Sequence, residues 1–280
     1  MQTVHCHGAQ IPALGFGTYG MSDAQLRRII PAAIQAGFRH IDTAQLYNNE
    51  SGVGEAWQDS GVVRSQFFIT TKVWVANYGA ESFETSVNDS LRRLRTDYID
   101  LLLLHWPSQD VPLKEQIEQL NTLVDKGKVL HIGVSNYNTA LLESAVRYSH
   151  YPLVTHQFEY HPYLDQRRVI HTTRALGMTV TAYCPMAIGR VLSEPVLLDI
   201  ARGHRRSVAQ VVLRWVIQQP GTIALSRTTN ASRLVENAGV FDFELDKHDM
   251  ARIHALAQGN SRIVDPPGLA PRWDSTDTAS

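Results

Sequence analysis

Ionisable side chains close several of the apolar runs of this chain. Asp42 ends "FRHID", Lys72 ends "FFITTK" and His105 ends "IDLLLLH". A carboxylate, an ammonium and an imidazole are groups with which proteins move protons and stabilise developing charge. Further apolar runs are followed by polar side chains, namely Ser135, Asn136, Gln157, Tyr183 and Arg227. If the ends of these runs meet in space, they predict one polar site.

The runs belong to a regular alternation of strand and helix patterns. Eight β-rich runs occur: "ALGFGT" (13–18), "FRHID" (38–42), "FFITTK" (67–72), "IDLLLLH" (99–105), "VLHIGVS" (129–135), "LVTHQ" (153–157), "TVTAY" (179–183) and "TIALS" (222–226). A continuous run such as "LLLL" must be covered on both faces, as in a parallel sheet. Eight strand–helix units without a linker predict an α/β fold, a single (β/α)8 TIM barrel domain over residues 1–280. An N-terminal extension and a C-terminal tail over the barrel complete it. An open doubly wound sheet is the alternative. In a barrel, the strand ends meet at one face.

Helix signals lie between the runs. Apolar residues recur at helical spacing over 26–34 and 208–216. Ser22 and Ser207 each precede a glutamine by three residues, which predicts capping boxes. Pro195 suits the first turn of another helix, and "ARGHRR" (201–206) is read as the solvated end of that helix rather than a binding patch.

The glycines of "LGFGTYGMSDAQ" resemble a phosphate-binding turn. Gly15, Gly17 and Gly20 have G-x-G-x-x-G spacing, and Asp42 follows about twenty residues later, as in a dinucleotide fingerprint. Short-chain dehydrogenases also need a Tyr-x-x-x-Lys pair, and none of the ten tyrosines has a lysine four residues later. We therefore assign these glycines to the first barrel strand and its turn.

Composition excludes several functions. The chain carries 26 basic and 27 acidic residues, so nothing indicates nucleic acid or an anionic membrane as a partner. No run of eighteen apolar residues occurs, and two cysteines give no disulfide framework. We expect a soluble, cytoplasmic protein. In an extended segment His5 and His7 would point away from Cys6, so "HCH" predicts no metal site.

Several motifs carry a family resemblance. The stretches "GFRHIDTAQLYNNESGVGEA", "TTKVW", "LLLLHWP", "GVSNY", "TAYCP" and "RTTNASRLVENAGVFDFEL" are similar to motifs of the aldo-keto reductases. The resemblance runs from about Ile11 to the end, and the tail "SRIVDPPGLAPRWD" adds to it. Within the family the chain looks most like the short bacterial 2,5-diketo-D-gluconate and methylglyoxal reductases.

The resemblance implies a catalytic tetrad of Asp42, Tyr47, Lys72 and His105 and reduction of an aldehyde or ketone with NADPH. Hydride addition to a carbonyl creates an alkoxide, which needs an acid beside the oxygen. Tyrosine has an ordinary pKa of about 10, and a neighbouring ammonium is expected to lower it by roughly 1–3 units. Lys72 would supply that charge, Asp42 would hold Lys72, and His105 would orient the carbonyl oxygen.

The resemblance also implies a cofactor site for NADPH/NADP+ across the barrel mouth. Ser135, Asn136 and Gln157 would bind the nicotinamide carboxamide, and Tyr183 would stack on the ring. The remaining cofactor residues are Thr18, Tyr19, Asp42, Arg227, Thr228, Arg233, Glu236 and Asn237. The predicted substrate residues are Tyr19, Tyr47, Trp74, His105 and Trp106. No metal is implied.

Two residues depart from the family pattern. Cys184 stands where many relatives carry serine, and Arg227 where many carry lysine near the adenosine phosphate. The connections after His105 and Tyr183 are short, which predicts an open and rather unselective pocket.

The predicted function is NADPH-dependent reduction of small dicarbonyl or keto-sugar substrates by a monomer. One alternative is a regulatory or interaction protein that keeps the barrel and the nucleotide. A second is the same enzyme working as an NADP-dependent alcohol oxidoreductase. A third, a barrel metallohydrolase, is disfavoured because no convergent His/Asp ligand set occurs.

Overall fold

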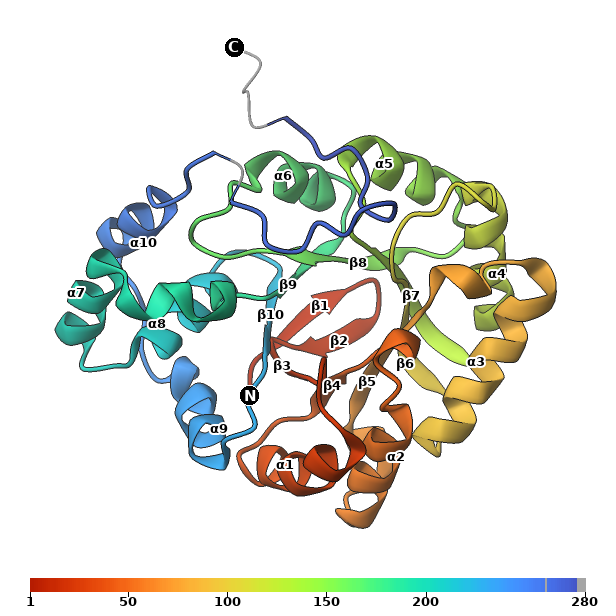
Figure 1. Ribbon diagram of the computed structural model, residues 1–280, viewed down its shortest axis with the longest axis horizontal. Coiled ribbons are helices and arrows are strands. Elements are labelled where there is room, and N and C mark those ends of the chain that lie inside the picture. Colours follow the sequence, from red (N-terminus) through yellow and green to blue (C-terminus); the bar gives the residue numbers. More distant parts are fainter. Residues whose placement is uncertain (260, 276–280) are drawn as a thin grey trace.

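The computed structural model describes residues 1–259 and 261–275 as a closed barrel of parallel strands surrounded by helices (Figure 1). The barrel strands are β3 (Leu14–Gly17), β4 (His40–Asp42), β5 (Phe68–Val73), β6 (Ile99–Leu104), β7 (Val129–Ser135), β8 (Leu153–Glu159), β9 (Thr179–Tyr183) and β10 (Thr222–Ser226). They pair in chain order, and β10 closes the barrel against β3. The predicted (β/α)8 barrel is confirmed, and the open sheet is excluded.

The helices follow the strands as the sequence patterns predict. They are α1 (Asp23–Gln35), α2 (Glu50–Asp59), α3 (Ala80–Leu94), α4 (Leu113–Asp125), α5 (Thr139–Tyr148), α6 (Arg167–Ala175), α7 (Pro195–His204), α8 (Val208–Ile217), α9 (Ala231–Ala238) and α10 (Lys247–His254). Both capping boxes form, at Ser22 and Ser207. Pro195 opens α7, which ends at His204 within the basic cluster.

The amino-terminal residues form a hairpin that the sequence patterns did not predict. Strands β1 (Thr3–Cys6) and β2 (Ala9–Pro12) pair antiparallel. Between them His7 and Gly8 adopt positive φ values of 46° and 87°, as a tight hairpin turn requires. The expectation that His7 continues an extended segment is therefore wrong. Ala9 and Ile11 of β2 pack against apolar side chains inside the barrel, namely Phe68, Leu101, Leu103, Val154 and Ile223. The hairpin therefore closes the amino end of the barrel.

Packing, not phosphate binding, explains the first glycine of the G-x-G-x-x-G stretch. A Cβ at Gly15 would lie 2.7 Å from the His40 ring and 2.7 Å from the Leu225 side chain. Only glycine therefore fits at this position of β3 without displacing its neighbours. Gly17 ends β3, and Gly20 adopts a φ of 68° in the following turn. The assignment of these glycines to a barrel strand and its turn is confirmed.

The tail crosses the end of the barrel where the strands finish. Figure 1 shows it passing over β8 and reaching α5. Backbone N–H groups of Ile263 and Val264 donate to Glu159, the last residue of β8. The predicted placement of the tail over the barrel is thus observed for 261–275, and Asn260 and residues 276–280 lie outside the described residues.

Gly54 sets the closest approach between α2 and α3. A Cβ there would overlap the Arg93 carbonyl oxygen and lie 2.8 Å from the Leu94 carbonyl carbon, both backbone atoms. We expect Gly54→Ala to lower the free energy of unfolding by about 1–3 kcal/mol through overpacking. Gly203→Ala, in α7 with nothing within 4 Å, should instead raise it by about 0.5–1 kcal/mol through helix propensity. Urea denaturation measures both, and a Gly54→Ala variant as stable as the parent would contradict this packing.

Candidate active site

The four predicted tetrad residues come together at the carboxyl end of the barrel. Asp42 ends β4, Lys72 lies near the end of β5, and His105 directly follows β6. Tyr47 ends the 3-10 turn η1 (Gln45–Tyr47), which follows β4. Parallel neighbouring strands end at the same face, which is why residues far apart in the sequence meet here.

A buried ion pair lies at the centre of the site. Lys72 Nζ is 2.6 Å from Asp42 Oδ1, and the two side chains are 1% and 3% exposed. The ammonium also donates to Thr43 O at 2.9 Å, and Gln157 Nε2 donates to the second Asp42 oxygen at 2.8 Å. Burial disfavours the ammonium, but Asp42 and then Tyr47 outweigh burial, so the pKa of Lys72 lies above its usual value. Lys72 is therefore a fixed positive charge.

Tyr47 lies beside this charge. Lys72 Nζ is 5.1 Å from the centroid of the Tyr47 ring. Burial raises the pKa of Tyr47, and the Lys72 charge opposes that rise without cancelling it. The expectation that the Lys72 ammonium brings the pKa of Tyr47 below its ordinary value of about 10 is therefore wrong. Desolvation of the phenol outweighs the effect of the ammonium. The phenol is protonated at neutral pH and is available as a donor.

His105 is neutral in this environment. Burial, and then repulsion by Lys72, lowers the pKa of His105 well below its usual value. Its Nδ1 is buried and has no hydrogen-bond partner among residues 1–259 and 261–275. The ring lies 5.7 Å from that of Tyr47 between centroids. A neutral imidazole donates from one ring nitrogen only, so His105 can offer one hydrogen bond beside Tyr47.

Aromatic side chains surround Tyr47 and His105. The Tyr19 ring contacts that of Tyr47 edge-on, with centroids 5.0 Å apart. The Trp74 ring contacts that of His105 in the same way at 5.5 Å. Trp106 follows His105 and is buried, whereas Tyr19 is 65% exposed. The structure thus gathers Tyr19, Tyr47, Trp74 and His105 into one aromatic group. The Trp106 ring contacts that of Trp273 instead.

The predicted nicotinamide residues form a hydrogen-bonded group next to the tetrad. Asn136 Nδ2 donates to His105 O and to Ser135 Oγ, both at 3.0 Å. The Tyr183 hydroxyl donates to Asn136 Oδ1 at 2.7 Å. Asn136 holds a φ of 64°, a left-handed conformation that asparagine tolerates better than most residues. Ser135, Asn136, Gln157 and Tyr183 are therefore all held by hydrogen bonds within the protein.

The remaining predicted cofactor residues lie between β10 and α9, along α9 and next to the end of β3. Arg227 is exposed, and its Nε donates to Tyr19 O at 2.6 Å, which joins the segment before α9 to the β3–α1 turn. Asn230 caps α9 by accepting from Ser232 N at 3.0 Å. Other side chains of the set have protein partners: Glu236 accepts from Ser207, Asn237 donates to Ser226, and Thr228 bonds the backbone of Asn230. Arg233 is exposed, and Thr18 is buried with its hydroxyl donating to Asp42 O.

Sequence reasoning missed a set of buried polar residues that hold the Tyr47 turn. Asn49 Nδ2 donates to Thr18 O at 2.9 Å and Met21 O at 3.0 Å. Gln45 accepts from Trp74 N at 2.9 Å, so Gln45 and Asn49 link the turn to two strand ends. Glu50 is buried and accepts from Thr71, Ser90 and Arg93. Gln45, Asn49 and Glu50 all lie inside the motif GFRHIDTAQLYNNESGVGEA, but the family resemblance assigned no function to them.

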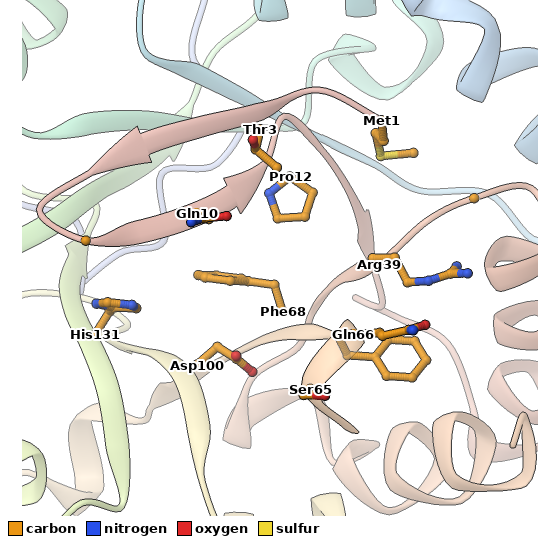
Figure 2. A pocket seen from close by; sticks show the side chains of 13 residues that line it. Met1, Thr3, Gln10, Pro12, Arg39, Ser65, Gln66, Phe68, Asp100 and His131 are labelled. Atoms are coloured by element: carbon orange, nitrogen blue, oxygen red, sulfur yellow. The ribbon is translucent and has the colours of Figure 1, made fainter. Parts of the chain in front are cut away.

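Two cavities lie away from the tetrad. One, of about 550 Å³, is at the amino end of the barrel, where Gln10, Arg39, Asp100 and His131 face it (Figure 2). The other, of about 560 Å³, lies behind Trp74 between η1 and α3. Neither is lined by a tetrad residue, so the site is defined by its side chains rather than by these two cavities.

Two kinds of site are not found within residues 1–259 and 261–275. These residues contain no cluster of three or more histidine, cysteine, aspartate or glutamate side chains that could hold a metal ion. In the same part of the chain, no helix has the length and apolar character needed to cross a bilayer.

Comparison with known proteins gives close matches along almost the whole chain. Methylglyoxal reductase DkgB of Salmonella typhi is 38% identical over 269 residues, covering 94% of this chain and 99% of that protein. Glyoxal reductase of Bacillus subtilis (strain 168) is 39% identical over 256 residues, covering 91% of this chain and 92% of its own.

Solved structures agree with these relatives. A crystal structure of a protein assigned as a 2,5-diketo-D-gluconic acid reductase B has a TM-score of 0.97 and 54% identity, covering 98% of each chain. The aldose reductase of Schistosoma japonicum has a TM-score of 0.89 and 29% identity, covering 94% of each chain. The family model described as aldo/keto reductase matches residues 13–258. This chain belongs to the aldo/keto reductase family and is an oxidoreductase.

Proposed function

We propose that this oxidoreductase reduces aldehydes or ketones to alcohols with NADPH and that Tyr47 is its general acid. The observation that carries the proposal is the buried Lys72 ammonium, held by Asp42 at 2.6 Å and lying 5.1 Å from the Tyr47 ring centroid. A protonated phenol beside a fixed positive charge is suited to donate its proton to an oxygen that gains negative charge.

The chain's own groups divide the work at the carbonyl. The Tyr47 phenol gives its proton to the carbonyl oxygen, and Lys72 stabilises the phenolate that remains. His105, neutral because burial lowers its pKa, donates one hydrogen bond that orients the same oxygen. Asp42 takes no proton in this scheme; it holds Lys72 in place and balances its charge. Asp42, Lys72 and His105 are buried, which limits competition by water for their bonds.

The residues present fit a nicotinamide nucleotide. Bound NADPH supplies the hydride. Ser135, Asn136 and Gln157 offer hydroxyl and amide groups to the carboxamide, and the half-buried Tyr183 ring offers an aromatic face. At the other end, the exposed Arg227 and the amino end of α9 suit a phosphate.

The substrate class follows from the relatives and from the aromatic walls. Methylglyoxal and glyoxal reductases and a 2,5-diketo-D-gluconic acid reductase are among the similar proteins. We infer that small dicarbonyl or keto-sugar compounds are the substrates here. Tyr19, Trp74 and Trp106 would contact the part of the substrate that does not react.

Replacing Tyr47 by phenylalanine removes the acid and leaves the ring. We expect Tyr47→Phe to lower kcat for methylglyoxal by about 10²–10⁴-fold, the usual contribution of general acid catalysis, with the Kd for NADPH changed less than about twofold. Tyr148→Phe, an exposed tyrosine on α5, is the matched control and should keep full activity. Loss of NADPH absorbance measures turnover, and Tyr47→Phe activity within about threefold of the parent would refute the assignment.

Arg227 should select NADPH over NADH, because only NADPH carries the adenosine 2′-phosphate. A hydrogen bond to a charged group contributes about 1.5–3 kcal/mol, so Arg227→Ala should weaken NADPH roughly 10–150-fold and hardly affect NADH. Arg147→Ala, exposed on α5, serves as the control. Dissociation constants for both nucleotides decide the point, and equal weakening of both would show that Arg227 does not bind the phosphate.

A further inference from the structure

The tail is held over the barrel mouth at two points. At the first, Glu159 Oε1 accepts from Ile263 N and Oε2 from Val264 N, both at 2.8 Å. At the second, Asp274 accepts from Thr139 N at 3.0 Å and from Thr139 Oγ1 at 2.7 Å. Residues 262–274, which we call the strap, therefore have one end fixed on β8 and the other on α5.

Glu159 is unusual among the groups that fix the strap because it is fully buried. It lies two residues after Gln157 on β8, and His161 Nε2 is 2.8 Å from its Oε1, with both side chains 0% exposed. Each carboxylate oxygen accepts a backbone N–H, an arrangement that a neutral amide side chain cannot reproduce, because it has one acceptor oxygen only. The proposed reaction gives this buried carboxylate no role.

The strap places an aromatic side chain against Trp106. The Arg262 guanidinium stacks on the Trp273 ring at 3.6 Å, and Trp273 Nε1 donates to Asp265 at 2.8 Å. The Trp273 ring meets the Trp106 ring edge-on, with centroids 6.3 Å apart. Trp106, a predicted substrate residue, directly follows His105 in the chain. The stacked pair of Arg262 and Trp273 therefore adjoins the predicted substrate site.

Both fixed points adjoin this stacked pair. Arg262 precedes Ile263, and Trp273 precedes Asp274. Burial lowers the pKa of Arg262, and the Glu159, Asp265 and Asp274 charges oppose that effect. Arg262 and Trp273 each lie next to a residue whose position is fixed by hydrogen bonds. The stacked pair therefore loses little conformational entropy when a substrate packs against it.

We propose that Glu159 is a positioning residue for substrate selection: it holds the strap so that Trp273, stacked under Arg262, forms a rigid outer wall of the substrate pocket. The inference rests on the proposed reduction of carbonyl compounds. Substrates with a large planar substituent reach this wall, whereas methylglyoxal is too small to reach it. Glu159 thus acts on recognition of the substituent and not on the proton transfer at Tyr47.

Phenylglyoxal and methylglyoxal test this wall because they share the same dicarbonyl group. They differ only in that phenylglyoxal carries a phenyl group where methylglyoxal carries a methyl group. In Glu159→Gln we expect KM for phenylglyoxal to rise about tenfold, the size of a lost apolar contact. We expect KM for methylglyoxal, kcat for both and the Kd for NADPH to change less than about twofold. Trp273→Ala should likewise raise KM for phenylglyoxal and not KM for methylglyoxal, although it keeps the hydrogen bonds of Glu159 to Ile263 and Val264. Asp100→Asn, a buried carboxylate that accepts from Ile69 N at the opposite end of the barrel, is the matched control.

Trypsin provides a readout that needs no activity. The bond between Arg262 and Ile263 is protected when Ile263 N is held by Glu159, so Glu159→Gln should be cut there at least several times faster, with no new cuts outside the strap. Equal KM changes for the two substrates, or unchanged KM values and unchanged cleavage, would overturn the role of Glu159. If the parent reduces neither substrate, the proposed function fails, and the trypsin result still decides whether Glu159 holds the strap.

Discussion

The buried ion pair between Lys72 and Asp42 is the constraint on which the site depends. A charge taken out of water is costly unless a partner and further hydrogen bonds compensate it. Here Asp42, the Thr43 carbonyl and Gln157 supply that compensation within 2.9 Å. Because these partners come from β4, its following turn and β8, the pair is satisfied only when the barrel is closed.

The ion pair also determines the states of its neighbours. The Lys72 charge disfavours a second cation, and with burial it keeps His105 neutral. The same charge opposes, without cancelling, the effect of burial on Tyr47, so the phenol stays protonated. The ammonium therefore helps burial to keep His105 neutral, whereas burial alone keeps Tyr47 protonated against the ammonium. The two neutral groups can both donate a hydrogen bond to a developing alkoxide.

Much of this arrangement could be predicted from the sequence. The apolar runs predicted the strands, and the polar residues that close them, such as Asp42 and Lys72, met at one face because the ends of parallel strands coincide. Tyr47 could be assigned only by resemblance, since it lies in a short turn with no periodic pattern.

The remaining features depend on tertiary contacts that no local pattern records. The direction of the Tyr47 pKa follows from its burial, which the sequence does not give. Glu159 bonds to Ile263, which is 104 residues away, although the alternation of polar residues through Gln157, Glu159 and His161 could have indicated one shared face. The β1–β2 hairpin could not be predicted in this way because its strands, TVHC and AQIP, contain no continuous apolar run.

Unfolding of ion-pair variants tests the central claim most directly. Urea denaturation of Asp42→Asn, Lys72→Met and the double variant gives three free energies of unfolding. If the pair is buried and mutually compensated, each single variant leaves a buried charge without its partner and loses about 3–5 kcal/mol. The double variant should then lose clearly less than the sum of the two single losses. Losses that simply add would contradict the account, because they would show that Lys72 and Asp42 do not stabilise each other.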